Sequence, residues 1–427
     1  MIIALLFFYA IALILAVKHP NYFLVYYLLA TTKFLGFIDP SSFIIGGVEI
    51  GYFGLNIIAI ISVFFQKGWY IMPKKTQWFI YFILLMLAYG IIKPFLDNNS
   101  SLYLSFMASK ETWFYFLFLY MIVYRDRIDN KQLLGFIKFI GIYLSLIYII
   151  GKISLQFVPP VYYNESYVRT FFPTYISLTI FIYAIKIKFE TIRSMKDRVT
   201  ILLLFLGVFF AAHLSLTIMT FIGFILYKYV YDKRLELNKY IVSRFIFITF
   251  IITSIALISI SGLYEKIVVN VEAIITGEDT SLNARDIYNE FRWEAINKQK
   301  NLGYGFIHQS SSFMKEIKIS GSNRFMERFT VIDSGYVDLL IKFGYIGTIL
   351  LILVLIIYYS RGFLKSYKNP LSLAMSIYLM QYVFINYTWS VFTFAHGIVP
   401  GVIAFHFLLS SNEDSIEKQV ITNNIII

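Results

Sequence analysis

Long apolar runs alternate with short polar segments along most of the chain. A helix that crosses about 30 Å of hydrocarbon needs roughly 17–25 predominantly apolar residues. Runs close to that length occur at residues 2–17, 22–38, 43–65, 77–95, 104–124, 133–157, 170–187, 199–212, 214–231, 243–261, 334–358, 370–388 and 396–410. The pattern predicts about thirteen membrane-spanning helices. The two runs on either side of His213 can also be explained as one bent element.

The charged residues divide the connecting segments into two kinds. Lysine and arginine gather in segments such as 125–131 and 186–198, whereas segments such as 96–102 and 159–168 contain neither. The two kinds alternate through the predicted spans, and the positive-inside rule places the basic segments in the cytoplasm. The N-terminus is then external and the C-terminal tail cytoplasmic. This topology explains most of the net charge of +12 without a nucleic-acid partner.

The composition agrees with a protein surrounded by membrane lipids. Of 427 residues, 59% are hydrophobic and 15% charged, and the mean hydropathy is +0.70. These values exclude a soluble enzyme, a disordered chain and a disulfide scaffold. The absence of cysteine also excludes thiol catalysis. With no basic residue before Lys18 and no small-residue cleavage site, the N-terminus predicts a retained first helix. We therefore expect an all-α polytopic integral membrane protein.

One connecting segment is much longer than the others. It covers residues 262–333, and the alternation of charge places it outside the cytoplasm. Long loops with their own structure are usually functional. The sequence thus predicts a transmembrane bundle (1–261), a large external loop (262–333), C-terminal spans (334–410) and a cytoplasmic tail (411–427).

Within this loop, residues 282–299 are predicted to form an amphipathic helix. Apolar residues recur at helical spacing on one stripe: Ala284, Ile287, Tyr288, Phe291 and Ala295. Arg285 and Arg292 lie two turns apart, so they point in nearly the same direction beside that stripe. Two guanidinium groups could then bind one anion, since their planar forks match phosphate. The alternative is that both pair with neighbouring glutamates or lipid phosphates on a solvated face.

Five further residues are candidates for binding or catalysis. Arg169, at the edge of a span, could hold an anionic ligand or extend to lipid head groups. Gly303 and Gly305 mark a tight turn that allows close approach to a phosphate. Asp333 could act as a general base, or it could cap the following helix. His308 is the second candidate base, with a plain surface position as the alternative.

Other kinds of chemistry lack support in the sequence. Asp338 and Lys342 are one turn apart and are expected to form a local ion pair. There is no His-Glu-x-x-His or clustered aspartate pattern, so no metal site and no cofactor are expected. The absence of a Walker A sequence argues against an ATP-driven pump. The spans also lack a chain of carboxylates, which argues against a proton-coupled transporter.

Several of these motifs resemble those of the Wzy-type O-antigen and capsule polymerases, which group with the O-antigen ligases. The resemblance is carried by Phe291-Arg292-Trp293-Glu294-Ala295, by Gly303-Tyr304-Gly305, and by Asp333-Ser334-Gly335-Tyr336 continuing to Gly344-Tyr345-Ile346-Gly347. Arg169, which precedes Phe171-Phe172-Pro173 by two positions, resembles an arginine in the smaller periplasmic loop of that family. The family often has Ser-Arg between the spans where this chain has His213-Leu-Ser. Ligases usually have histidine at the position of Asp333, which favours a polymerase.

The resemblance implies a GT-C-type glycosyltransferase in the bacterial inner membrane, acting at the periplasmic face. Its substrate would be an oligosaccharide linked to undecaprenyl diphosphate, and a chain-length regulator would be a possible partner. The implied counter-charges for the diphosphate are Arg169, Arg285 and Arg292. Asp333 is the implied base, with His308 second. Gly303, Gly305 and Tyr336 are the remaining implied substrate-binding residues.

Two other functions remain open at this point. A ligase would pass the glycan to a sugar of the lipid A core. A flippase or other transporter of lipid-linked oligosaccharide would use the arginines for binding alone, but the chain shows no pseudo-symmetric halves. The loop aromatics Tyr288, Trp293 and Tyr304 could stack on sugar rings or pack beneath the loop.

Overall fold

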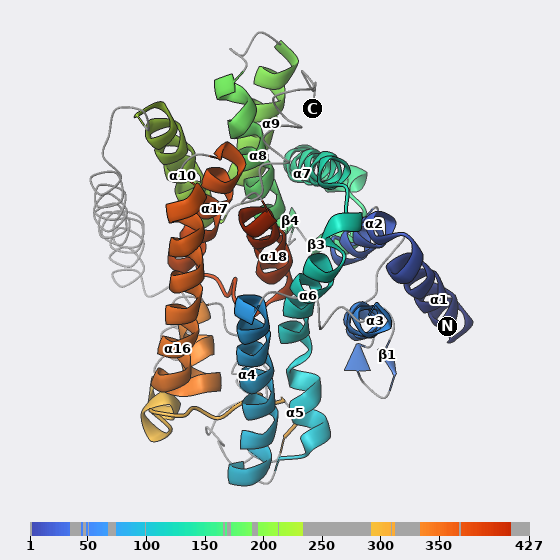
Figure 1. Cartoon of the computed structure of the whole chain (residues 1–427), viewed down its shortest axis with the longest axis vertical. Coiled ribbons are helices and arrows are strands. Elements are labelled where there is room, and N and C mark those ends of the chain that lie inside the picture. The colour runs from blue at the N-terminus through green and yellow to red at the C-terminus, as the bar shows by residue number, and fades with distance from the viewer. Residues whose placement is uncertain are drawn as a thin grey trace.

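The computed structural model describes fourteen stretches of the chain, and all further statements refer to them. These stretches are residues 2–34, 44–45, 48–49, 51–66, 74–98, 100–164, 167–168, 172–189, 195–211, 213–233, 292–308, 310–311, 334–366 and 369–410. They are almost entirely helical (Figure 1). The β-structure within them is limited to two short antiparallel pairs, Ile44–Ile45 (β1) with Val48–Glu49 (β2) and Tyr163–Asn164 (β3) with Tyr167–Val168 (β4). The expected all-α membrane fold is confirmed.

The helices follow the predicted spans closely. The α-helices are α1 (Ile2–Lys18), α2 (Pro20–Thr31), α3 (Gly51–Phe65), α4 (Lys74–Asn98), α5 (Leu102–Ala108), α6 (Phe116–Val123), α7 (Asn130–Ile153), α8 (Pro173–Phe189), α9 (Met195–Phe210), α10 (Leu214–Lys233), α16 (Gly335–Ser366), α17 (Pro370–Ile385) and α18 (Ala395–Ser410). The 3₁₀ helices are η4 (Lys110–Tyr115), η5 (Arg125–Arg127), η6 (Leu155–Phe157) and η7 (Pro160–Tyr162). Three segments are long and apolar enough to cross a membrane: Gln77–Asp97, Asn130–Ile153 and Gly335–Ile357. Shorter apolar helices surround them, so the chain is a multi-pass membrane protein.

Two predicted spans differ in the structure. The run 104–124 is not one helix, because α5 ends at Ala108 and η4 separates it from α6. The Ser109 hydroxyl donates to the Phe106 carbonyl (2.6 Å), which competes with the helical ladder at that point. The run 43–65 begins with the β1–β2 pair, and its helix starts only at Gly51. On either side of His213, α9 and α10 are two separate helices.

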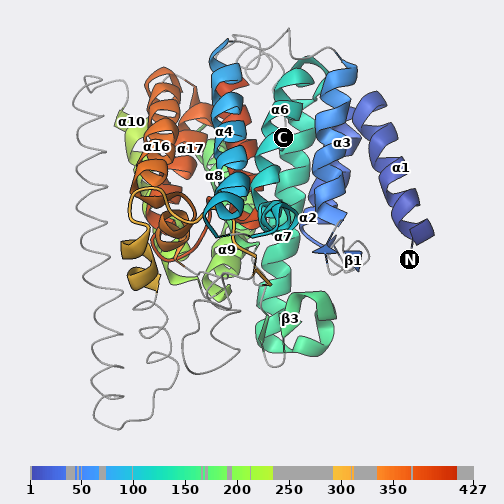
Figure 2. The same ribbon diagram turned by 90° about the horizontal axis from the view of Figure 1, so that it is seen from below.

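The centre of the bundle is α17, which is buried around nearly its whole circumference. A helix that is apolar on all sides belongs inside a bundle rather than on its surface. It packs against α8, α10, α16 and α18. Figure 1 shows α17 and α18 among these helices, with α1 and α3 at one side, and Figure 2 shows α10 and α16 at the opposite side. The core is therefore assembled from both halves of the sequence.

Three helices contain interruptions that release backbone groups. Pro94 lies inside α4 and Pro400 inside α18, and a proline has no N–H for the carbonyl four residues earlier. In α16 the break is at Gly344, whose φ of 62° and ψ of −170° are not helical. In α18 the released carbonyl of His396 accepts a hydrogen bond from the Thr174 hydroxyl of α8. The other two interruptions share a different partner, described below.

Candidate functional site

The break in α16 is closed by the segment 299–306 of the predicted external loop. Carbonyls and amides on both sides of Gly344 bond to this segment instead of to their own helix. The hydrogen bonds are Tyr304 N to Ile341 O (2.7 Å), Gly305 N to Lys342 O (2.8 Å), Tyr345 N to Lys300 O (2.9 Å) and Ile346 N to Asn301 O (3.1 Å). Broken backbone within a spanning helix is tolerated where protein satisfies its polar groups. The loop segment is therefore part of the structure of α16.

Glycine is required on both sides of this junction. Gly303, Gly305 and Gly344 all have positive φ, which other residues rarely adopt. A Cβ on Gly303 would lie 2.5 Å from the Gly344 nitrogen, and one on Gly344 would lie 2.4 Å from the Asn301 carbonyl carbon. The close approach of Gly303 and Gly305 to a phosphate stays a prediction, and in the structure these glycines bring the loop close to the backbone of α16 and α4. The amides of Tyr304 and Gly305 are occupied by protein carbonyls.

The same loop also fills the interruption in α4. The carbonyl of Gly90 is released by Pro94, and it accepts a hydrogen bond from the Phe306 amide at 2.6 Å. Tyr89, on the same helix α4, donates a hydrogen bond from its hydroxyl to the Leu302 carbonyl of the loop. A Cβ on Gly305 would lie 2.5 Å from the Gly90 oxygen, so the loop is pressed against α4 as well. Figure 1 shows this loop in gold crossing from the lower end of α16 toward α4 and α5.

Apolar contacts hold the loop helix 292–298 against the first turns of α16. The side chains of Ala295, Ile296 and Tyr304 form a buried cluster with Val337, Leu340 and Ile341. The Tyr304 hydroxyl donates to the Ala295 carbonyl at 2.9 Å. Burial raises the pKa of Tyr304, and the negative charge of Glu294 raises it further. Tyr304 therefore packs beneath the loop, whereas Trp293 is 43% exposed.

Arg292 is the first described residue of this loop helix, and its side chain is buried. It keeps 8% of its surface exposed, so it does not lie on the solvated face that was one of the two expectations. Glu294 and Lys298 do lie on that face and form an exposed ion pair at 2.7 Å. A guanidinium costs much free energy to remove from water, and it is usually retained where it meets an anion. Residues 282–291 of the predicted helix lie outside the described residues.

His308 follows the loop and has a defined hydrogen-bonding role. Its Nδ1 accepts the Ser310 amide at 3.1 Å, so the neutral ring has its proton on Nε2 when assigned from this bond. Burial lowers the pKa of His308, and the positive charge of Lys110 lowers it further. In this arrangement the ring is a hydrogen-bond donor through Nε2–H. Its Nδ1 lone pair is not available to accept a proton from a substrate.

The start of α16 is fixed to the end of α17. The Ser334 hydroxyl donates to the Tyr387 carbonyl at 2.9 Å, and the Tyr336 hydroxyl donates to the Val383 carbonyl. Gly335 lies against the side chain of Asn386 with no space for a Cβ. Tyr336, predicted to bind substrate, here holds the helix in position through its hydroxyl.

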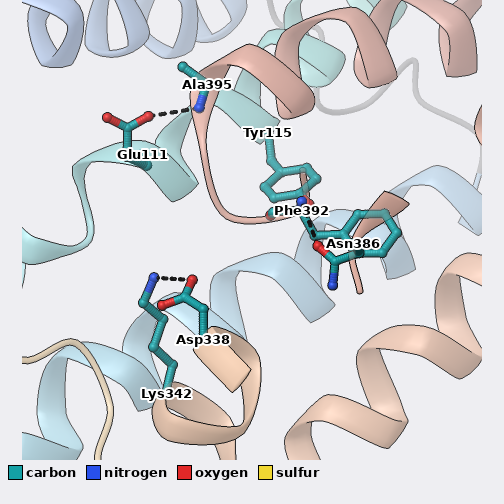
Figure 3. A network of polar contacts seen from close by, with 7 residues as sticks. All are labelled: Glu111, Tyr115, Asp338, Lys342, Asn386, Phe392 and Ala395. Carbon is teal, nitrogen blue, oxygen red and sulfur yellow. Dashed lines mark hydrogen bonds and ion pairs between the residues drawn. The ribbon is translucent and has the colours of Figure 1, made fainter. Parts of the chain in front are cut away.

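A charged pair lies one turn before the break. Lys342 Nζ donates to Asp338 Oδ2 at 2.7 Å, which confirms the expected ion pair (Figure 3). The ammonium also lies 6.0 Å from the ring centre of Phe306 and 5.9 Å from that of Phe394. Residues from the loop and from the α17–α18 connection therefore meet at this side chain of α16.

The helix η4 belongs to this region, although the sequence pattern did not predict a site residue there. Glu111 Oε2 accepts the amide of Ala395 at 2.8 Å, at the start of α18 (Figure 3). Its neighbour Lys110 lies close enough to His308 to affect the pKa of that ring. The segment η4 thus binds the start of α18, and the charge of its Lys110 acts on His308 of the loop. Two adjacent charges within an otherwise apolar run were the signal that could have found it.

Three predicted site residues lie outside the described residues: Arg169, Arg285 and Asp333. The tenth predicted span (243–261) and most of the loop 262–333 also lie outside them. Of the others, Arg292, Gly303, Gly305 and His308 are brought together on one loop that is bound to α4 and α16. Tyr336 lies at the start of α16 and bonds to α17.

A comparison with known protein families found a match that includes this region. A family model described as O-antigen ligase (Wzy_C) matches residues 199–352, from α9 to beyond the break in α16. The comparison with curated proteins gave no match. The matched region contains the loop helix 292–298, the glycine junction and the Asp338–Lys342 pair, and members of this family are glycosyltransferase-like membrane enzymes. Over this region the chain is similar to the O-antigen ligase family, and the match supports a relationship to the O-antigen ligases and polymerases.

Proposed function

We propose that this protein is a polymerase of O-antigen or a related surface polysaccharide. It transfers a growing glycan from undecaprenyl diphosphate onto the sugar of another lipid-linked repeat unit. The observation that supports this most is the buried Arg292 on a loop bound to a broken spanning helix, inside the region that matches the family. Aspartate at position 333, where ligases usually have histidine, favours polymerase over ligase.

The reaction requires a counter-charge for a leaving diphosphate. The acceptor hydroxyl oxygen forms a bond to the anomeric carbon, and the bond from that carbon to the diphosphate oxygen breaks with its electron pair. Negative charge then grows on the diphosphate, and fixed cations in a poorly hydrated site stabilise it strongly. We assign this role to Arg292, together with Arg169 and Arg285.

The acceptor hydroxyl must also lose its proton. We assign Asp333 as the base that takes it, because a carboxylate at the entry of a spanning helix can be partly desolvated and made more basic. The structure favours a different role for His308, whose Nε2–H can donate to a sugar or phosphate oxygen. The charge pattern of the connecting segments supports a site at the periplasmic face of the bacterial inner membrane.

A deletion of the gene tests the function directly. Lipopolysaccharide from the deleted strain is separated on a gel, and the glycans on the lipid carrier are analysed in parallel. The expected result is lipid A core with a single repeat unit and no ladder. Bare core with long glycan left on the carrier would identify a ligase instead. Bare core with single repeats trapped on the cytoplasmic side would identify a flippase, and an unchanged ladder would contradict the proposal.

A further inference from the structure

The Asp338–Lys342 pair is asymmetric in its exposure. The Asp338 side chain is buried, with 2% of its surface exposed, whereas the Lys342 side chain has 19% of its surface exposed. The pair therefore presents its positive end outward and hides its negative end. Both residues belong to a helix that is long and apolar enough to cross the membrane. An ionisable side chain in such a position usually serves binding or transport.

Stability does not account for this pair. Removing two charges from water costs free energy that their mutual attraction often fails to recover, so apolar residues would serve packing at least as well. The rings of Phe306 and Phe394 meet the ammonium from two different segments and limit its movement. Asp338 accepts one N–H of the ammonium, which leaves further N–H donors for another acceptor.

The backbone of Lys342 ties this cation to the loop that contains Arg292. Its carbonyl accepts the Gly305 amide, and the neighbouring Ile341 carbonyl accepts the Tyr304 amide. The side chain of the same residue lies under Phe306, two residues before His308. The loop and the cation therefore take up their positions together. A ligand that the loop covers would meet Lys342 from the side of α16.

We propose that Lys342 binds a phosphate or diphosphate ester through its ammonium group, and that Asp338 is the positioning residue that orients it. The chemical class of the ligand rests on the proposed function. The anion could come from the lipid-linked diphosphate or from an anionic phospholipid head group. Lys342 is thus a binding residue on α16, separate from the arginines of the loops.

Binding by the purified full-length protein in nanodiscs tests the assignment without any activity. The probes are farnesyl diphosphate, the uncharged farnesol, and phosphatidylglycerol added to phosphatidylcholine nanodiscs. Lys342→Met is expected to weaken diphosphate binding about tenfold or more and to leave farnesol binding within about twofold, because only a charge-assisted contact is lost. Lys342→Arg should keep most of the affinity. Lys93→Met is the matched control, because Lys93 also pairs with an aspartate four residues away, on α4.

Each outcome has a distinct meaning. Unchanged diphosphate binding in Lys342→Met, with farnesyl diphosphate bound by the wild type, would overturn this inference alone. Equal weakening of diphosphate and farnesol binding in Lys342→Met and in a second variant, Lys342→Gln, would show a packing role and overturn it as well. Selective loss of phosphatidylglycerol binding would support the anion site and identify a head group as its ligand. No binding of farnesyl diphosphate by the wild type would instead count against the proposed function.

Discussion

The loop 292–308 binds both α4 and α16, and each of these helices has a Lys/Asp ion pair. The two pairs differ in which of their charges is exposed. Both α4 and α16 have an interrupted backbone, and both have a Lys/Asp pair four residues apart. On α16 the carboxylate is covered and the ammonium is accessible, with exposures of 2% and 19%. On α4 the carboxylate is the more exposed of the two groups, since Asp97 is 33% exposed and Lys93 is 13% exposed. The α16 end thus offers a cation, and the α4 end an anion.

The helix dipoles explain part of this difference. Asp338 lies in the first turn of α16, where the positive end of the dipole favours a carboxylate. Asp97 lies in the last turn of α4, where the dipole is unfavourable and water must stabilise the charge. Two pairs of the same composition therefore differ in what they present to a ligand. The comparison indicates that α16 contributes to anion binding and that α4 supports the loop.

The largest expected effect comes from filling the junction at α16. Gly344→Val forces a branched side chain into a positive φ and against Asn301, so we expect a loss of about 3 kcal/mol or more in stability. The loop would no longer dock, and transfer activity should be lost with it. Thermal unfolding followed by tryptophan fluorescence measures the first effect. Gly135→Ala on α7, where a Cβ meets open space, is the control and should be neutral or slightly stabilising.

The two aspartates provide the next test. Asp338→Asn removes a covered charge that holds Lys342, and we expect a loss of about 1–3 kcal/mol because the lysine is left partly buried without its counter-charge. Asp97→Asn should cost less than Asp338→Asn, because the Asp97 carboxylate is 33% exposed and its charge is screened by water. Thermal unfolding of both variants in the same detergent gives the comparison. Equal effects in the two variants would remove the distinction between the helices.

A smaller effect concerns pH and the loop. The pKa of His308 in the folded protein lies below its ordinary value of 6.5. Above pH 6.5 the ring is neutral in both the folded and the unfolded state, so its titration does not change the free energy of unfolding. As pH falls below 6.5, the unfolded ring takes up a proton that the folded ring resists, so stability decreases down to the lowered folded pKa. The thermal midpoint measured between about pH 7.5 and 5.5 should fall less in His308→Gln than in the wild type.

The smallest expected effect comes from α4. Pro94→Ala restores an N–H that competes with the Phe306 amide for the Gly90 carbonyl. We expect a change of about 1 kcal/mol or less in stability, with a modest loss of activity, because the loop keeps its bonds to α16. Hydrogen exchange at the loop amides measures the release. Protection that stays unchanged at Phe306 would show that the helix does not reclaim its carbonyl.

Much of the fold was predictable, because apolar runs of spanning length follow directly from the thickness of the hydrocarbon. The helix near Ala295 and the Asp338–Lys342 pair were predictable for the same kind of reason, since helical spacing is local. The role of the glycines was not. Gly303 and Gly344 are far apart in sequence, and only the folded chain shows that Gly303 leaves space for the backbone of Gly344 and that Gly344 leaves space for the backbone of Asn301 and Leu302.

The part played by η4 also depends on tertiary structure. Residues 104–124 have a continuous apolar pattern, so periodicity alone predicts one helix there. The contact of Glu111 with the start of α18 joins residues that are 284 positions apart. Similarly, helical spacing placed Arg292 beside the apolar stripe without determining whether it would be exposed. Its burial is seen only in the folded chain.

The most direct test of the account is glycan extension by the purified protein. Undecaprenyl-diphosphate-linked repeat units are supplied in proteoliposomes, and the products are separated by length. The wild type should give a ladder, and Arg292→Ala should reduce the rate by about 10²–10³-fold while the protein stays folded and inserted in the membrane, with Arg292→Lys in between. A ladder formed at the wild-type rate by Arg292→Ala would contradict the central claim.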